Sequence, residues 1–317
     1  MKIVILDGQV MGGSAEDFPR LKEFGELTVY DITPPEKVIE RIGDAEIVIV
    51  DKTPLTEEVF SACSGIRFVA VLATGYNIVD TAAARRHGIP VANVPGYAGA
   101  IVAQTTIALM LELFNKVGEH NGSVHRGDWT RSLYFCYTCG PITEAEGKTI
   151  GIIGLGNIGT RVARIAAAMG MRILVYTRTE WPIGLPDFRF TSLPDLLRES
   201  DVVSLHVPQF PETEHIINRE SLAMMKPGAV LINTSRGGLL DEAAVAEALN
   251  SGRLAGAAVD VLDTEPMRPD CPLLTAKNCI ITPHIAWASE EAIGRIRDVT
   301  YENVKAFLEG RELNIVN

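Results

Sequence analysis

The sequence predicts an α/β protein built from two doubly wound parallel sheets. Short apolar runs alternate with helical patterns along the whole chain, which is typical of strand–helix units packed around parallel sheets. These runs fall into two series, separated by a long apolar segment at residues 99–117. A length of 317 residues with 47% hydrophobic content also suits about two soluble globular domains.

The first series predicts five strands of one compact sheet. Its runs are residues 2–7, 27–31, 46–51, 67–74 and 90–94. The second series predicts six strands, which with their intervening helices match a doubly wound sheet of the dinucleotide-binding type. Its runs are residues 149–154, 172–177, 202–207, 229–234, 256–261 and 279–283.

Two helical segments set the expected domain boundaries. Residues 99–117 have dense apolar positions that suit a largely buried helix, and we expect this helix to bridge the two series. Residues 289–310 follow the last strand of the second series and end on Gly310, so this helix can return to the first domain. We therefore expect one domain of residues 1–98 plus 286–317, another of residues 99–285, and a cleft between them.

Composition disfavours several classes of partner. The formal net charge of −11 argues against nucleic acid, because binding to the phosphate backbone depends on clustered Lys and Arg. No apolar run approaches the roughly 20 residues that cross a bilayer. The N-terminal run lacks the features of a signal peptide. We expect a cytoplasmic protein without a membrane partner.

The cysteines predict free thiols in a reducing compartment, because their number, five, is odd and no secretory signal is present. Cys136 and Cys139 form a C-x-x-C pair. A zinc site would need two further ligands at matching spacing, and Cys63, Cys271 and Cys279 are scattered singly. We expect no metal site, and the pair has no assigned role.

The strongest local motif is the run GLGNIG, which starts at Gly154. It follows a predicted strand and opens a helical pattern, the context in which this motif binds the pyrophosphate of a dinucleotide. Gly154 permits the tight turn, Gly156 lets the backbone approach the pyrophosphate, and Gly159 allows close packing of helix on strand. Asn157 and Ile158 open the helix whose N-terminus faces the anion. The alternative is a glycine-rich turn without a ligand.

The end of the next predicted strand bears on the choice between NAD and NADP. An NAD site usually places Asp or Glu about 20 residues after the glycines, to bind the ribose 2′-hydroxyl. Here the strand ends in Thr177, Arg178 and Thr179, and the acid is missing. Hydroxyls and a guanidinium can bind a 2′-phosphate that a carboxylate would repel. The sequence favours NADP, with an NAD site that lacks the acid as the alternative.

Charged residues stand at the ends of several strands of the second series. Arg236 lies among glycines that let the backbone crowd a ligand, and its planar guanidinium suits a carboxylate. Glu265 follows the fifth strand and His284 the sixth. A carboxylate bonded to one imidazole nitrogen favours the protonated ring and orients the other nitrogen, which provides a general acid. His206, at the end of the third strand, is a competitor that spacing does not exclude.

Five motifs follow one another along the chain: IIGLGNIG, DVVSLHVP, LINTSRGGLLDE, AAVDVLDTEP and TPHIAWAS. In their order and spacing the chain resembles the D-2-hydroxyacid dehydrogenase family over nearly its whole length, and within it the glycerate dehydrogenases and hydroxypyruvate/glyoxylate reductases. The resemblance implies a flavodoxin-like substrate domain and a Rossmann dinucleotide-binding domain. It implies reversible NAD(P)H-dependent reduction of hydroxypyruvate or glyoxylate to D-glycerate or glycolate. It also implies a homodimer in which residues 99–141 form an arm.

The resemblance also implies roles for individual residues. Arg236 binds substrate, and Glu265 with His284 forms the acid/base pair. Thr74 and Gly75 offer backbone N–H groups to the substrate carboxylate, with less support from the motifs. Lys52 is a further candidate for a substrate contact. The implied cofactor contacts outside the glycine motif are Asp260, toward the nicotinamide amide, and Thr106, His206, Val207, Pro208, Thr234 and Ser235.

Two alternatives stay open. Relatives that act on phosphoglycerate often present an arginine near the position of Lys52, so an unphosphorylated substrate is favoured over phosphoglycerate or a larger 2-hydroxyacid. A cofactor-sensing interaction protein, like the corepressors that resemble this family, would share the fold. Such a protein would not need Arg236, Glu265 and His284 together, so an enzyme is favoured.

Overall fold

The structure is a computed structural model that describes residues 1–185 and 187–317. The chain forms two compact units, Met1–Tyr97 with Ala288–Asn317, and Ala98–Trp287. The expected boundaries, 98/99 and 285/286, differ from this division by one and two residues. Ala286 belongs to the second unit, where its backbone N–H donates to the Asp260 carboxylate at 2.8 Å.

The first unit is built on a five-stranded, wholly parallel sheet. Its strands are β1 (Lys2–Ile5), β2 (Glu26–Val29), β3 (Ile47–Val50), β4 (Phe68–Val71) and β5 (Val91–Ala92). The order β2-β1-β3-β4-β5 is the flavodoxin-like one. Strands β3 and β4 are buried along their whole length, as parallel strands covered on both faces require.

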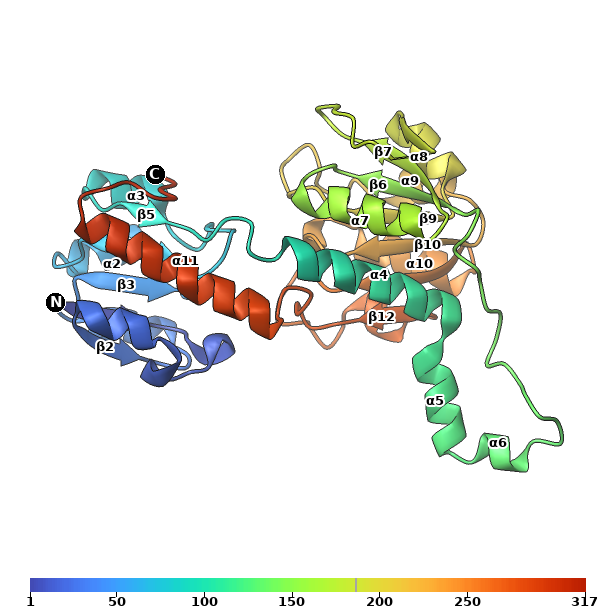
Figure 1. The fold of residues 1–317 in the computed structure, drawn as a ribbon, viewed down its shortest axis with the longest axis horizontal. Helices are drawn as coiled ribbons and strands as arrows, with labels where there is room; N and C mark the ends of the chain where they lie inside the picture. The colour runs from blue at the N-terminus through green and yellow to red at the C-terminus, as the bar shows by residue number, and fades with distance from the viewer. Residues whose placement is uncertain (186) are drawn as a thin grey trace. The chain divides into compact units, whose positions relative to one another are not determined.

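Short helices and one long helix complete the first unit. They are η1 (Gln9–Met11), η2 (Ala15–Asp17), η3 (Pro19–Phe24), η4 (Pro35–Lys37), α1 (Val38–Ile42), α2 (Glu57–Ala62), α3 (Thr81–Arg86) and α11 (Glu290–Leu308). Helix α11 lies along the sheet (Figure 1), and its Phe307 stacks on Phe68 of β4 with ring centroids 4.6 Å apart. Beyond α11, Ile315 pairs antiparallel with Ala92 of β5. The end of the chain therefore closes this side of the sheet.

The second unit is built on a seven-stranded parallel sheet. Its strands are β6 (Thr149–Ile153), β7 (Arg172–Tyr176), β8 (Phe188–Phe190), β9 (Val202–Leu205), β10 (Ala229–Asn233), β11 (Leu254–Val259) and β12 (Cys279–Ile281). Their order is β12-β11-β10-β9-β6-β7-β8. The chain reverses its direction of winding between β6 and β9, and doubly wound sheets bind ligands at the carboxyl edge of such a point. The predicted fold class is confirmed.

The expectation of six strands in the second sheet was wrong, because β8 adds a seventh. Strand β8 has three residues, FRF, and lies at the sheet edge beside β7. None of its residues is fully buried. A strand so short and so exposed offers neither an apolar run nor a readable alternation.

The helices of the second unit follow the strands. They are α4 (Gly99–Asn115), α5 (Val117–His125), α6 (Asp128–Arg131), α7 (Asn157–Ala168), α8 (Leu193–Glu199), α9 (Arg219–Met224), η5 (Gly237–Leu239), α10 (Glu242–Asn250) and η6 (Pro272–Thr275). The helix predicted over residues 99–117 ends at Asn115, because Lys116 turns left-handed with φ of 52°. Helix α4 belongs to the second unit and lies along α7, and α5 and α6 extend away from the sheet (Figure 1).

Among the described residues, no single helix is long and apolar enough to cross a membrane. Helices α4 and α5 reach the length and hydropathy of a span only as a pair, and the two are bent by 57°. Helix α4 completely buries Ala103 and Met110 within the protein.

Candidate active site

The glycine motif connects β6 to α7 at the switch point of the second sheet. Gly154 has φ of 99°, and a Cβ on it would lie 2.6 Å from the carbonyl oxygen of His206, after β9. A Cβ on Gly159 would lie 2.1 Å from the carbonyl oxygen of Gly154. Both positions require glycine, because any side chain would separate the loop from the helix and from the neighbouring strand.

Gly156 is different, because a Cβ on it would meet nothing within 4 Å. It is the exposed N-cap of α7, and no side chain of the described residues caps the helix. Asn157 is exposed and Ile158 half-buried behind it. The first backbone N–H groups of α7 therefore face open space, and this part of the chain fits the pyrophosphate of a dinucleotide.

The segment after β7 lies beside the glycine loop, since the carbonyl oxygen of the strand's last residue accepts the N–H of Gly154 at 2.8 Å. Thr177 is half-buried, and Arg178 and Thr179 are exposed. The guanidinium carbon of Arg178 lies 5.9 Å from the ring centroid of Phe210, which follows β9. A guanidinium held over an aromatic ring beside the dinucleotide loop is suited to a phosphate group.

His206 lies at the switch point but is unsuited to proton transfer. Its Nε2 lies 2.9 Å from Ser204 Oγ. Part of the residue is exposed, yet Nδ1 is buried and has no hydrogen-bond partner among the described atoms. Burial lowers the pKa of the ring to about 3. His206 is therefore neutral near physiological pH, which removes it as the competing general acid.

The loops after β9 and β10 carry the remaining expected cofactor contacts. Val207 is half-buried and Pro208 exposed. Ser235 donates its hydroxyl to the carbonyl oxygen of Leu205 at 2.8 Å, which joins the two loops. Thr234 is buried beneath them. These residues lie at the carboxyl edge of adjacent strands, beside the glycine loop.

Thr106 departs from the expectation of a direct cofactor contact. It is completely buried in α4, where its hydroxyl donates to the carbonyl oxygen of Val102 at 2.8 Å. The same oxygen lies 2.9 Å from Thr234 Oγ1. Thr106 therefore supports Thr234 from behind and has no surface left for a ligand.

Glu265 and His284 lie at the other end of the same carboxyl edge, after β11 and β12, and form a close pair. His284 Nδ1 lies 2.6 Å from Glu265 Oε2, and Glu265 Oε1 accepts the Leu262 N–H at 3.0 Å. Burial raises the pKa of the Glu265 carboxyl, but these hydrogen bonds and the nearby charges of His284 and Arg236 outweigh it and hold the pKa below its ordinary value of 4.5. Glu265 is therefore a carboxylate at neutral pH.

Asp260 fixes the loop that carries His284. Its carboxylate is buried and accepts hydrogen bonds from Thr282 Oγ1 at 2.6 Å, from Ile285 N–H at 2.9 Å and from Ala286 N–H at 2.8 Å. His284 between them has φ of 54°, a left-handed conformation uncommon outside glycine. The family resemblance implied only a cofactor contact for Asp260. Its position in a buried strand end was the available signal, because a buried carboxylate needs N–H or O–H donors.

Arg236 is brought next to this pair by its glycine neighbours. A Cβ on Gly237 would lie 1.8 Å from the carbonyl carbon of Leu262, so only glycine lets the Arg236 turn pack against the segment that leads to Glu265. Arg236 is exposed and donates to the carbonyl oxygen of Ser235 at 2.7 Å. A cation, a carboxylate and a histidine therefore meet at one edge of the second sheet.

The candidates in the first unit also share one sheet edge. Thr74 and Gly75 follow β4, and Thr74 is held by its own hydroxyl on the Val94 carbonyl and by the Asn93 side chain on its carbonyl, both at 2.8 Å. Lys52 follows β3, with its ammonium 3.3 Å from Asp51 and its side chain 63% exposed.

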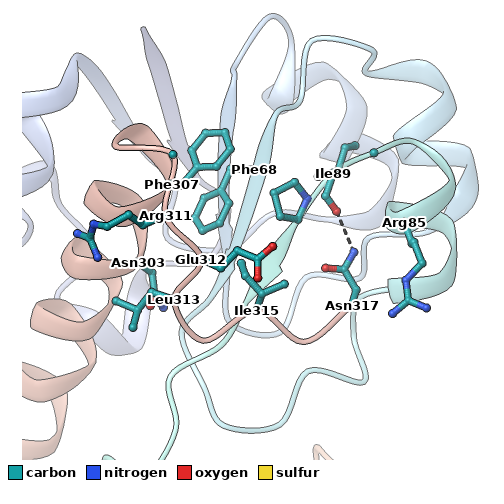
Figure 2. A pocket seen from close by; sticks show the side chains of 13 residues that line it. Phe68, Arg85, Ile89, Asn303, Phe307, Arg311, Glu312, Leu313, Ile315 and Asn317 are labelled. Carbon is teal, nitrogen blue, oxygen red and sulfur yellow. Dashed lines mark hydrogen bonds between the residues drawn. The ribbon is translucent and has the colours of Figure 1, made fainter.

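A cavity of about 380 Å³ occupies the opposite edge of the first unit (Figure 2). It is lined by the start of β4, the residue before β5, and the ends of α3 and α11 with the segments that follow them. Phe68 and Phe307 form one wall, and the Glu312 carboxylate lies near the middle of the view. None of the candidate residues lines it. No group of three or more His, Cys, Asp or Glu in the described residues could hold a metal ion.

A Rossmann sheet carries a dinucleotide loop and, along the same carboxyl edge, a cation and a histidine paired with a carboxylate. These features define a nicotinamide-dependent oxidoreductase. Comparison with known proteins agrees. The sequence profile described as D-isomer specific 2-hydroxyacid dehydrogenase, NAD binding domain, matches residues 107–286. The chain belongs to the D-isomer specific 2-hydroxyacid dehydrogenase family, as its motifs predicted.

Individual relatives match over essentially the whole chain. A hydroxypyruvate reductase of Blautia hydrogenotrophica is 49% identical over 100% of both proteins. A glycerate dehydrogenase of Methylorubrum extorquens is 39% identical over 99% of this chain and 98% of its own length. Among solved structures, an acyclic imino acid reductase in complex with NADPH and D-Arg superposes with a TM-score of 0.87, at 30% identity and full coverage of both chains.

Proposed function

We propose that the protein reduces hydroxypyruvate or glyoxylate to D-glycerate or glycolate with a nicotinamide cofactor, reversibly. The observation that carries the proposal is the meeting of Arg236, Glu265 and His284 at the same sheet edge as the dinucleotide loop. The full-length similarity to a hydroxypyruvate reductase and a glycerate dehydrogenase supports the same substrate class. An interaction protein that only senses the cofactor has no use for this set of residues.

The residues divide the chemistry between them. The nicotinamide cofactor supplies the hydride when it is bound. Arg236 binds the carboxylate of the 2-oxoacid and orients its carbonyl group. His284 gives a proton to the carbonyl oxygen from Nε2, because Glu265 holds Nδ1. Glu265 stays ionised and stabilises the protonated ring, as the carboxylate of a catalytic triad does. Thr74 and Gly75, at the carboxyl edge of the first sheet, are further candidates to offer backbone N–H groups to a carboxylate.

NADP is the preferred cofactor in this proposal. The segment after β7 presents Thr177, Arg178 and Thr179 where an NAD site usually has an acid. Arg178 lies over Phe210 without a carboxylate partner among the described residues, so its charge is available to a 2′-phosphate. The similar acyclic imino acid reductase was solved with NADPH.

A homodimer in the cytoplasm completes the proposal. Helices α5 and α6 extend from the second unit (Figure 1), and the segment after them exposes Leu133, Tyr134 and Phe135. Adjacent exposed apolar side chains of this size mark a protein interface. The negative net charge and the oxidoreductase site support small molecules, not nucleic acid, as ligands.

A substrate panel tests the proposal directly. Initial rates of cofactor oxidation would be measured with hydroxypyruvate, glyoxylate, pyruvate and phosphohydroxypyruvate, each with NADPH and with NADH. We expect the highest kcat/KM with hydroxypyruvate or glyoxylate. Preference for phosphohydroxypyruvate would assign the enzyme to phosphoglycerate chemistry, and no turnover across the panel would contradict an oxidoreductase acting on these acids.

A further inference from the structure

Asp7 collects three consecutive backbone N–H groups on one carboxylate. Its Oδ1 accepts the N–H of Asp51 at 2.7 Å, and its Oδ2 accepts those of Lys52 at 2.5 Å and Thr53 at 2.6 Å. Hydrogen bonds from N–H groups to a carboxylate are charge-assisted, and three on one group define the path of the backbone.

Where β3 ends, these bonds take the place of the backbone hydrogen bonds between neighbouring strands. The last ladder partner on this side is Val50, whose carbonyl oxygen accepts the Leu72 N–H at 2.8 Å. Asp51 and Thr53 are then 4% and 5% exposed, so water has little access to their backbone groups. Without Asp7, these N–H groups would be left without a partner, which is unfavourable at the buried residues Asp51 and Thr53. The turn keeps its shape because Asp7 is there.

Asp7 and this turn flank the topological switch point of the first sheet. The chain passes from β1 to β2 on one side of β1 and then continues with β3 on its other side. Asp7 lies just beyond β1, and residues 51–53 just beyond β3. The crevice outside the carboxyl ends of two such strands is where α/β sheets bind ligands.

Lys52 is the one residue of the turn whose side chain is largely exposed, at 63%, whereas that of its ion-pair partner Asp51 is only 4% exposed. The charge of its ammonium group is therefore partly offset on one side by a buried carboxylate. The other side of the group is open to solvent. Two carboxylates, Asp7 and Asp51, lie at this edge, so an anionic ligand depends on Lys52 to offset their repulsion.

We propose that Asp7 is a positioning residue for the substrate: it fixes the turn at residues 51–53 so that Lys52 presents its ammonium to the oxygen atoms of the 2-oxoacid. This inference rests on the proposed function. Asp7 itself touches backbone and no reacting atom, and its effect passes through Lys52.

The test is a double-mutant cycle on the full-length protein with D7N, K52M and the double variant. kcat and KM for hydroxypyruvate would be measured at saturating NADPH, the Kd of NADPH by fluorescence, and the melting temperature in parallel. We expect D7N to raise KM about tenfold with a smaller change in kcat, and the Kd of NADPH to stay within about twofold. In the K52M background the same change should raise KM less than about threefold, because the two residues act as one unit.

The matched control is D44N, the same chemical change at an exposed aspartate that pairs with Lys2 at 2.6 Å on the surface of the same unit. It should leave KM unchanged. If D7N does not stay folded at the assay temperature, D7E enters the same cycle, since it keeps both acceptor oxygens but moves them by one methylene.

The possible outcomes distinguish a failure of this inference from a failure of the proposed function. An unchanged KM in D7N, an equal tenfold effect with and without Lys52, or a parallel loss of NADPH affinity would each overturn the positioning role. An inactive wild-type protein on all 2-oxoacids would instead overturn the proposed function, and this inference with it.

Discussion

His284 Nδ1 lies 2.6 Å from Glu265 Oε2, while the backbone of the same histidine is held in a left-handed conformation with φ of 54°. The pairing commits Nδ1 to the carboxylate and leaves Nε2 without a partner among the described residues. Strained backbone of this kind persists only where surrounding bonds impose it, and here the buried Asp260 carboxylate supplies them. The second unit thus leaves one imidazole nitrogen without a hydrogen bond to the described part of the protein, as the proposed proton donor requires.

Replacing His284 by glutamine should remove the proton donor without disturbing the dinucleotide loop. We expect H284Q to lower kcat by about 10²- to 10⁴-fold, the usual contribution of a general acid, and to leave the Kd of NADPH nearly unchanged. Steady-state kinetics and fluorescence titration check the two halves of this expectation.

The chain offers a matched control for that variant. His87 forms a second histidine–carboxylate pair, with Nε2 2.7 Å from Glu57 Oε1, on the surface of the first unit at the end of α3. H87Q should keep its full kcat. Retention of turnover in H284Q would move the general acid to another group and contradict the assignment.

Removing the guanidinium after β7 should reverse or erase the cofactor preference. R178A loses the cation proposed to pair with the 2′-phosphate, so we expect the Kd of NADPH to rise by about tenfold or more and that of NADH to change by less than about twofold. Titration with each reduced cofactor measures both. Equal losses of affinity for the two cofactors would show that Arg178 does not contact the 2′-phosphate.

The lowered pKa of Glu265 predicts that the stability of the protein depends on pH. A carboxyl group whose pKa is lower in the folded than in the unfolded protein stabilises the fold above its ordinary pKa, and that contribution is lost as the pH falls through the folded-state value. The wild-type protein should therefore exceed E265Q in melting temperature at neutral pH, and the difference should shrink below pH 4.5. A difference that stays constant down to about pH 3 would contradict the pairing.

The five thiols should differ strongly in reactivity. Burial, with smaller effects from Cys271 and Glu242, raises the pKa of the Cys279 thiol to about 12, whereas Cys136 is exposed. Because only the thiolate reacts, iodoacetamide should label Cys136 first in the native protein and Cys279 only after unfolding. Peptide mass spectrometry follows both sites. In C136S the half-buried Cys139 should become the first site labelled, and early labelling of Cys279 would contradict its raised pKa.

The fold was predictable because parallel strands buried on both faces leave long apolar runs in the sequence. Runs such as IVIV of β3 and AVLIN of β10 are buried at every residue. Strand β8 was missed because its three residues at a sheet edge, none of them buried, carry no such signal. The break at Lys116 was missed because the apolar pattern of α4 runs on to it without Gly or Pro, and a left-handed residue ends the helix instead.

The candidate site was predictable to the extent that it follows strand ends. Carboxyl ends of adjacent parallel strands share one edge, so placing Arg236, Glu265 and His284 after their strands was enough to expect them together. The spacing of residues in the sequence could not show how deeply each side chain is buried. Thr106 is completely buried behind Thr234, and burial of the His206 ring lowers its pKa to about 3. Residues that act on backbone, such as Asp7, leave no pattern beyond a single acid after a strand.

The most direct test of the central claim is a single reaction followed to its product. The purified protein would be incubated with hydroxypyruvate and NADPH, the loss of NADPH absorbance would be recorded, and the product would be resolved by chiral chromatography. The account predicts rapid oxidation of NADPH with one D-glycerate formed for each NADPH consumed. Formation of L-glycerate, or oxidation of NADPH without glycerate, would contradict it.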